Sequence, residues 1–128
     1  MRKRSAVCLC PVLLVAACGP AVRSAPFKTV PPRPTDHEIV LFSTKLPTCP
    51  YDELGLITAE RRHGFNSYES VLDAMKVRAR QMGGDAVVAL NQQQTVNGGT
   101  VVGKAVSINT DQAVSGTVIR FTESGCTR

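Results

Sequence analysis

Residues 66–90 read NSYESVLDAMKVRARQMGGDAVVAL, and this stretch decides the fold because it joins an amphipathic helix to a buried strand. Its apolar side chains recur every three or four residues, a spacing that places them on one face of a helix. They are Tyr68, Val71, Leu72, Met75, Ala79 and Met82. The opposite face carries Glu69, Asp73, Lys76 and Arg80. The pattern predicts one helix whose apolar stripe packs against the rest of the domain.

Both ends of this helix are marked in the sequence. Asn66 followed by Glu69 resembles a capping box, in which Asn66 accepts from the amides of the first turn. Gly83-Gly84 supplies the left-handed residue that commonly ends a helix. We therefore expect a sharp reversal of the chain directly before the next strand.

Strand-type runs lie on both sides of the helix. Residues 85–90 predict a central strand, because the run is apolar on both faces after Asp85. The other runs are 38–43, 54–59, 100–108 and 114–122, with the turn-rich segment 109–112 between the last two. Strand, helix, strand in this order favours a right-handed parallel crossover between 54–59 and 85–90.

The predicted fold class is α+β, with one amphipathic helix packed on a mixed sheet of about five strands, in the order β-β-α-β-β-β, and one disulfide. With 128 residues the chain is long enough for one core and not for two. We assign this domain to residues 37–128.

The first seventeen residues predict a secretory signal. Arg2, Lys3 and Arg4 form a positive n-region, and residues 6–17 are apolar apart from Pro11. That run is well short of the roughly 20 residues that a membrane-spanning helix needs.

The signal ends in Val15-Ala16-Ala17-Cys18-Gly19, which is similar to a bacterial lipobox. In that interpretation Cys18 is lipidated and anchors the chain to a membrane. The alternative is an ordinary signal cleavage that leaves Cys18 as a free thiol. Gly19 stands where Asp would retain a lipoprotein in the inner membrane, which favours the outer membrane, with the domain in the periplasm or partly surface-exposed.

Residues 18–36 predict a tether. The segment has five prolines and few apolar side chains, so it offers little burial to offset the entropy of ordering. As an extended chain it would reach roughly 55 Å.

Removal of the signal leaves Cys18, Cys49 and Cys126. Once Cys18 carries lipid, a single pair remains in an oxidising compartment, and we predict a structural disulfide between Cys49 and Cys126. No C-x-x-C spacing indicates a redox-active pair.

The formal charge of +5 lies outside the predicted domain. Residues 37–128 contain nine basic and nine acidic residues, so the excess belongs to the signal and the tether. This distribution excludes a basic nucleic-acid groove as the leading hypothesis.

No motif predicts catalysis. Residues 98–104 match the P-loop spacing G-x-x-x-x-G-K, but Ala105 stands where that loop needs Ser or Thr, and Asn97-Gly98-Gly99 favours a hairpin turn. His37 and His63 have no second ligand at zinc spacing and predict solvated loop residues. The pairs Asp52-Glu53 and Arg61-Arg62 predict solvated charge. We therefore expect no enzyme, no catalytic residue, no cofactor and no metal site.

Three segments carry a resemblance to the RcsF-like outer-membrane lipoproteins. They are Cys49 ahead of LGLI at 54–57, MGGDAVV at 82–88, and GTVIRF at 116–121 leading to Cys126. The last two are also similar to the YbjQ-like fold, once described as heavy-metal-binding. RcsF-like domains carry two disulfides, whereas this chain supplies cysteines for one.

The resemblance implies an envelope-stress sensor of the Rcs phosphorelay that contacts outer-membrane β-barrel proteins and an inner-membrane signalling partner. Two alternatives remain open: a periplasmic small-ligand or metal-binding module of YbjQ-like fold, and a structural lipoprotein without catalytic activity.

Overall fold

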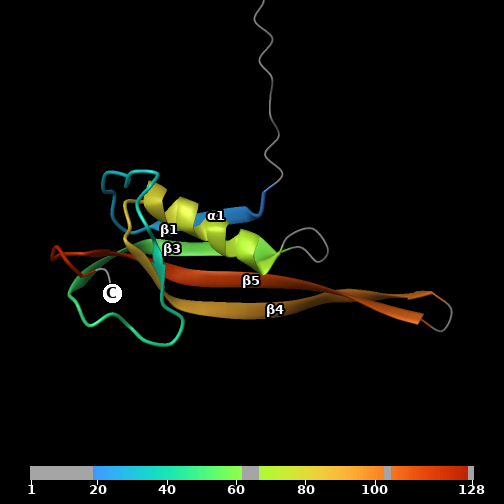
Figure 1. The fold of residues 1–128 in the computed structure, drawn as a ribbon. Coiled ribbons are helices and arrows are strands. Elements are labelled where there is room, and N and C mark those ends of the chain that lie inside the picture. Colours follow the sequence, from blue (N-terminus) through green and yellow to red (C-terminus); the bar gives the residue numbers. More distant parts are fainter. Residues whose placement is uncertain (1–18, 62–66, 103–104, 127–128) are drawn as a thin grey trace, which may run out of the picture.

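The computed structural model describes residues 19–61, 67–102 and 105–126, with backbone only for 93–102 and 105–111. Along the chain lie β1 (Ala21–Pro26), β2 (Val40–Leu41), β3 (Tyr51–Arg61), α1 (Tyr68–Gln81), β4 (Ala86–Val102) and β5 (Ala105–Phe121). Figure 1 shows α1 lying across one face of the sheet, and the hairpin of β4 and β5 extending well beyond it.

The five strands form one mixed sheet in the order β1-β3-β5-β4-β2. β1 with β3, β3 with β5, and β4 with β5 are antiparallel pairs, whereas β2 and β4 are parallel. β3 and β4 therefore run parallel to each other, with β5 inserted between them. The predicted crossover joined residues 54–59 and 85–90. These two segments are parallel as predicted, but they are not neighbours in the sheet.

The predicted fold class is confirmed: one helix packs on a mixed sheet of five strands, and one disulfide closes the domain. The details differ, because the order is β-β-β-α-β-β and the C-terminal half contains two long strands. Residues 97–99 and 109–112, which we expected to turn, lie within β4 and β5. The β4–β5 pairing accommodates 97–99 through a register shift between Val96 and Gly99, a place where glycine is common.

The helix starts one residue later than predicted. Its N-cap is Ser67, whose hydroxyl accepts from the Ser70 amide at 3.1 Å, while the Ser70 hydroxyl donates to the Ser67 carbonyl at 2.8 Å. Asn66 lies outside the described residues. The predicted end is confirmed, because Gly83 has a φ of 82° directly after the C-cap residue Met82.

The main core lies between α1 and the sheet. Val71, Met75 and Ala79 of α1 are fully buried there. The sheet contributes Leu54, Ile57, Ala59, Val87, Val114 and Val118. A smaller cluster of Ala86, Val88 and Ile119 packs with Val40, Phe42, Tyr51 and Phe121. Because side chains alternate along β4 and β5, this second cluster lies on the face of the sheet opposite α1.

The segment expected to be a tether belongs to the folded domain over most of its length. Ala21–Pro26 is edge strand β1, paired with β3 from Ala21↔Glu60 to Pro26↔Gly55. Val22 and Val30 pack against the main core, and Arg78 donates to the Ser24 hydroxyl at 2.7 and 3.0 Å. The prediction was wrong because backbone pairing and polar contacts, which composition does not reveal, hold a proline-rich chain at a sheet edge.

Candidate functional site

The most buried charged group in the described chain is Asp85, which is 5% exposed. It lies between the end of α1 and the start of β4. Its backbone is fixed on both sides: its amide donates to the Ile119 carbonyl at 2.8 Å, and its carbonyl accepts from the Val40 amide at 3.2 Å. The Asp85 carboxylate is therefore held at a defined position where β2, β4 and β5 meet.

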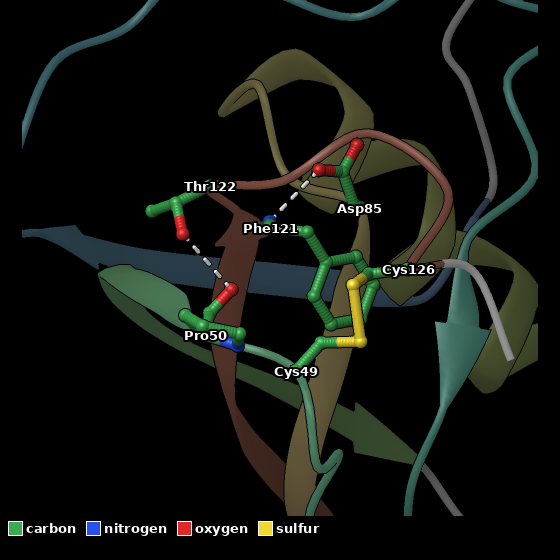
Figure 2. The surroundings of a disulfide bond; sticks show 6 residues. All are labelled: Cys49, Pro50, Asp85, Phe121, Thr122 and Cys126. Atoms are coloured by element: carbon green, nitrogen blue, oxygen red, sulfur yellow. Dashed lines mark hydrogen bonds between the residues drawn. A yellow bond between two sulfur atoms is a disulfide. The ribbon is translucent and has the colours of Figure 1, made fainter.

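Three groups surround this carboxylate. Arg33 Nη2 lies 2.8 Å from Oδ1 and 2.9 Å from Oδ2, and His37 Nε2 lies 2.8 Å from Oδ1. The Phe121 amide donates to Oδ2 at 3.0 Å, as Figure 2 shows. A buried carboxylate requires such partners, because an unpaired buried charge is strongly destabilising. We call Arg33, His37 and Asp85 the Asp85 cluster.

The segment that supplies Arg33 and His37 is attached to the end of α1. The Arg33 amide donates to the Arg80 carbonyl at 2.8 Å, and Arg80 Nε donates to the His37 carbonyl at 2.6 Å. Arg80, predicted on the solvent face of the helix, thus contacts residue 37 instead. The segment before β2 is therefore bonded to α1 through Arg80 and contacts the sheet through Asp85.

The contacts at Oδ1 differ from those at Oδ2. Oδ1 and His37 Nε2 are within ion-pair distance but lack the angles of a directed hydrogen bond, and Arg33 Nε is buried without a hydrogen-bond partner among the described residues. The contact at Oδ1 is therefore one of charge proximity, whereas Oδ2 accepts two directed hydrogen bonds.

A cleft of about 540 Å³ opens beside the Asp85 cluster. Its lining includes Arg33, His37, Asp85, Asp52 and Arg120, together with residues 121–126 of the C-terminal turn. Cations and carboxylates are mixed along its walls, so the cleft suits a small polar ligand better than an apolar one.

The disulfide lies at the rim of this cleft. Cys49 and Cys126 are bonded with a Cα–Cα distance of 5.9 Å, within the usual range for a disulfide, so the predicted pairing is confirmed. Next to it, the Thr122 hydroxyl donates to the Pro50 carbonyl at 3.2 Å (Figure 2). The Thr122 amide donates to the same carbonyl at 3.1 Å. The bond fastens the chain before β3 to the turn after β5.

The structure brings some of the predicted residues together and not others. Cys49 and Cys126 are bonded to each other. The prediction that His37 is a solvated loop residue is wrong, because its Nε2 lies 2.8 Å from the Asp85 carboxylate. Asp52 pairs with Lys28 at 3.0 Å on the surface. Arg61 donates to Gln112 at 3.1 Å. Cys18, Arg62 and His63 lie outside the described residues.

Asp85 and Arg33 were not identified as partners from the sequence. One signal was present: Asp85 is the single charge at the start of an otherwise apolar strand. Its partners come from 52 and 48 positions earlier in the chain, and their proximity depends on the folded N-terminal segment.

The described residues contain no group of three His, Cys, Asp or Glu side chains placed to hold a metal ion. No helix among them is long and apolar enough to cross a membrane. In comparisons with known proteins, no family model, no curated protein and no solved structure matches this chain.

Proposed function

We propose that this protein is an outer-membrane-anchored lipoprotein that acts in envelope-stress signalling through protein–protein contacts. The observation that carries the proposal is the sequence Val15-Ala16-Ala17-Cys18-Gly19 after a short, positively headed apolar run. It supports lipid attachment at Cys18.

The fold adds a constraint on how such a protein would act. β1 begins at Ala21, three residues after Cys18. Three residues span at most about 10 Å, so a lipid on Cys18 would keep the folded domain close to the leaflet. Partners would then meet the domain at the membrane surface, and not at the end of a long tether.

The polar groups of the Asp85 cluster support a structural role more than a catalytic one. Asp85 is occupied by Arg33, His37 and the Phe121 amide, so its carboxylate already has the contacts that a substrate would otherwise provide. In this proposal the cluster keeps the N-terminal segment folded onto the domain.

The proposal is tested with an envelope-stress reporter in a strain that lacks the gene for this chain. We expect the wild-type chain to restore induction and Cys18→Ser, which cannot carry the lipid, to leave it silent. Induction that is unchanged by the deletion would refute the signalling role. Full complementation by Cys18→Ser would refute the requirement for an anchor.

The cleft beside Asp85 favours a second candidate, a periplasmic module for a small polar ligand. The metal-binding form of this alternative has no group of three ligand side chains among the described residues to support it. Calorimetry on the detergent-extracted protein with a panel of divalent metal ions and inorganic phosphate tests it. Binding heat that is lost in Arg33→Ala would support this function. If neither heat nor a thermal shift is observed and the deletion leaves induction of the reporter unchanged, a structural lipoprotein remains.

A further inference from the structure

The outer edge of β4 is open along most of its length. β5 pairs with β4 from Ala86 to Val102, but β2 covers its other side only at Ala86 and Val87. A backbone bond from the Leu90 amide to the Phe42 carbonyl, at 3.4 Å, extends this cover slightly. Among the described residues, no strand pairs with the outer edge of residues 91–102.

This open edge belongs to a projecting ribbon. β3 accompanies β5 only as far as the pair Arg61↔Gln112, and beyond it β4 and β5 continue as two strands to Val102↔Ala105. Figure 1 shows this ribbon reaching away from α1 and the rest of the sheet. An isolated two-stranded ribbon has marginal stability in water, so additional pairing would stabilise it.

The sequence of this edge lacks charge and proline, two of the usual protections against pairing, although β4 has a third in its register shifts at Val88/Asn91 and Val96/Gly99. Residues 86–103 contain no charged residue, no histidine and no proline, and include the run Gln92-Gln93-Gln94. Natural sheet edges commonly carry charges or prolines that block the approach of another strand. The opposite edge of this sheet follows that rule, because β1 carries Arg23 and Pro26.

We propose that residues 91–102 of β4 pair antiparallel with the same residues of a second copy of this chain, which joins two five-stranded sheets into one. An antiparallel pair of identical strands has a two-fold axis and brings like residues close together. Charged side chains would repel one another in that arrangement, whereas this segment has none. The absence of charge is thus what a self-pairing strand requires.

The cover of β4 fixes where the two-fold axis lies. Because β2 and Phe42 occupy the edge up to Leu90, the longest unobstructed pairing is centred near Asn97, which then lies opposite its own copy at the axis. Gly98 and Gly99 then lie near the axis, and glycine in a strand often marks a close approach of another backbone. This inference is independent of the lipid on Cys18, so its failure would leave the proposed function untouched.

Cysteine crosslinking in cells that express the full chain tests the pairing. Thr95→Cys places a thiol near the axis, and Val77→Cys is the matched control on the exposed side of α1, where the native side chain is 47% exposed. With a short bifunctional maleimide we expect a crosslinked homodimer from Thr95→Cys and none above background from Val77→Cys. Equal yields from the two variants, or an adduct of Thr95→Cys with a different protein only, would overturn the proposal.

A charge substitution tests the reason for the pairing. In the Thr95→Cys background, Asn97→Lys brings two lysines to the axis, whereas Ser107→Lys adds the same charge to β5, opposite Thr100. We expect Asn97→Lys to lower the dimer yield at least about tenfold, which corresponds to about 1.4 kcal/mol, and Ser107→Lys to lower it much less. Circular dichroism and an intact Cys49–Cys126 bond show that both variants fold. An unchanged yield in a folded Asn97→Lys variant would contradict the proposal.

Discussion

At the scale of single residues, Asp85 connects the N-terminal segment to β5 through one side chain. Its carboxylate contacts Arg33 and His37 from the N-terminal segment and the Phe121 amide from β5. It is buried, whereas the Arg33 and His37 side chains are 26% and 27% exposed. Partial exposure of the partners screens the ion pair and lowers its contribution to stability.

We predict that Asp85→Asn lowers the free energy of unfolding by about 1–3 kcal/mol, below the range for a fully buried pair because of that exposure. The amide can still accept from the Phe121 amide, but it leaves Arg33 without a counter-charge. Urea unfolding measures the change. Asp73→Asn, whose side chain is 74% exposed on α1, is the control and should change stability by no more than about 0.5 kcal/mol. Equal effects from the two substitutions would show that the cluster does not hold the domain together.

Gly83 offers a second test of the folded N-terminal segment. A Cβ at this position would meet the Pro31 carbonyl oxygen and the Val30 side chain, and φ is 82°. Gly125 has a φ of 96° but no heavy atom within 4 Å of the corresponding Cβ, so it carries the backbone cost alone.

We therefore predict that Gly83→Ala destabilises the protein more than Gly125→Ala, by about 1–3 kcal/mol of added steric conflict. Hydrogen exchange should also accelerate at the Arg33 and His37 amides in Gly83→Ala, because the colliding segment is displaced from the helix end. Exchange at these amides that matches the Gly125→Ala variant would mean that residues 30–37 do not pack on Gly83.

At the scale of elements, the disulfide fastens one end of the antiparallel β3–β5 pair, where the start of β3 meets the end of β5. Cys49 and Cys126 are 77 positions apart, so the bond closes most of the domain into a loop. A loop of that length restricts the unfolded chain by roughly 4–5 kcal/mol in chain-entropy estimates. A small domain has a total stability of about 5–15 kcal/mol, so the bond supplies a large part of it.

We predict that the double substitution Cys49→Ala and Cys126→Ala lowers the free energy of unfolding by about 2–5 kcal/mol. Thermal unfolding followed by circular dichroism measures the loss. Treatment of the wild type with a reductant should give a comparable decrease, whereas the double variant should not respond. A wild-type protein whose transition is insensitive to reductant would contradict this role of the bond.

The elements also show what the sequence could predict. The helix, its glycine end and the cysteine pair follow from local patterns, because apolar spacing, left-handed glycine and cysteine counting are properties of short segments or of composition. β1 and the long β4–β5 ribbon could not be predicted in this way. Residues 97–99 and 109–112 favour turns locally, and only their pairing across the ribbon makes them strands.

The candidate site was the least predictable part for the same reason. Asp85 stood out as a charge beside an apolar run, but its partner Arg33 lay in a proline-rich stretch that composition assigns to a tether. In the native structure this contact is accompanied by the pairing of β1 with β3 and by the bonds that join Arg80 to residues 33 and 37. Contacts between distant segments of this kind depend on tertiary structure.

At the scale of the whole molecule, the excess of basic residues lies N-terminal to most of the folded domain. The basic residues in excess lie in residues 1–36, whereas residues 37–128 have no net formal charge. Because β1 and the Asp85 cluster include Arg23 and Arg33, part of that excess is paired within the folded domain: Arg23 lies 3.8 Å from Glu60, and Arg33 contacts Asp85. The net charge of the chain therefore does not indicate what the folded domain binds.

The central claim is that a lipid on Cys18 holds this domain at the membrane, where it contacts other envelope proteins. In-cell crosslinking of the full-length chain, followed by its purification and identification of the adducts, tests this claim most directly, with Cys18→Ser as the matched control. We predict discrete adducts with one or a few envelope proteins from the wild type, and their loss in Cys18→Ser. The same adducts from Cys18→Ser, or none from a wild-type chain present in the membrane fraction, would contradict the claim.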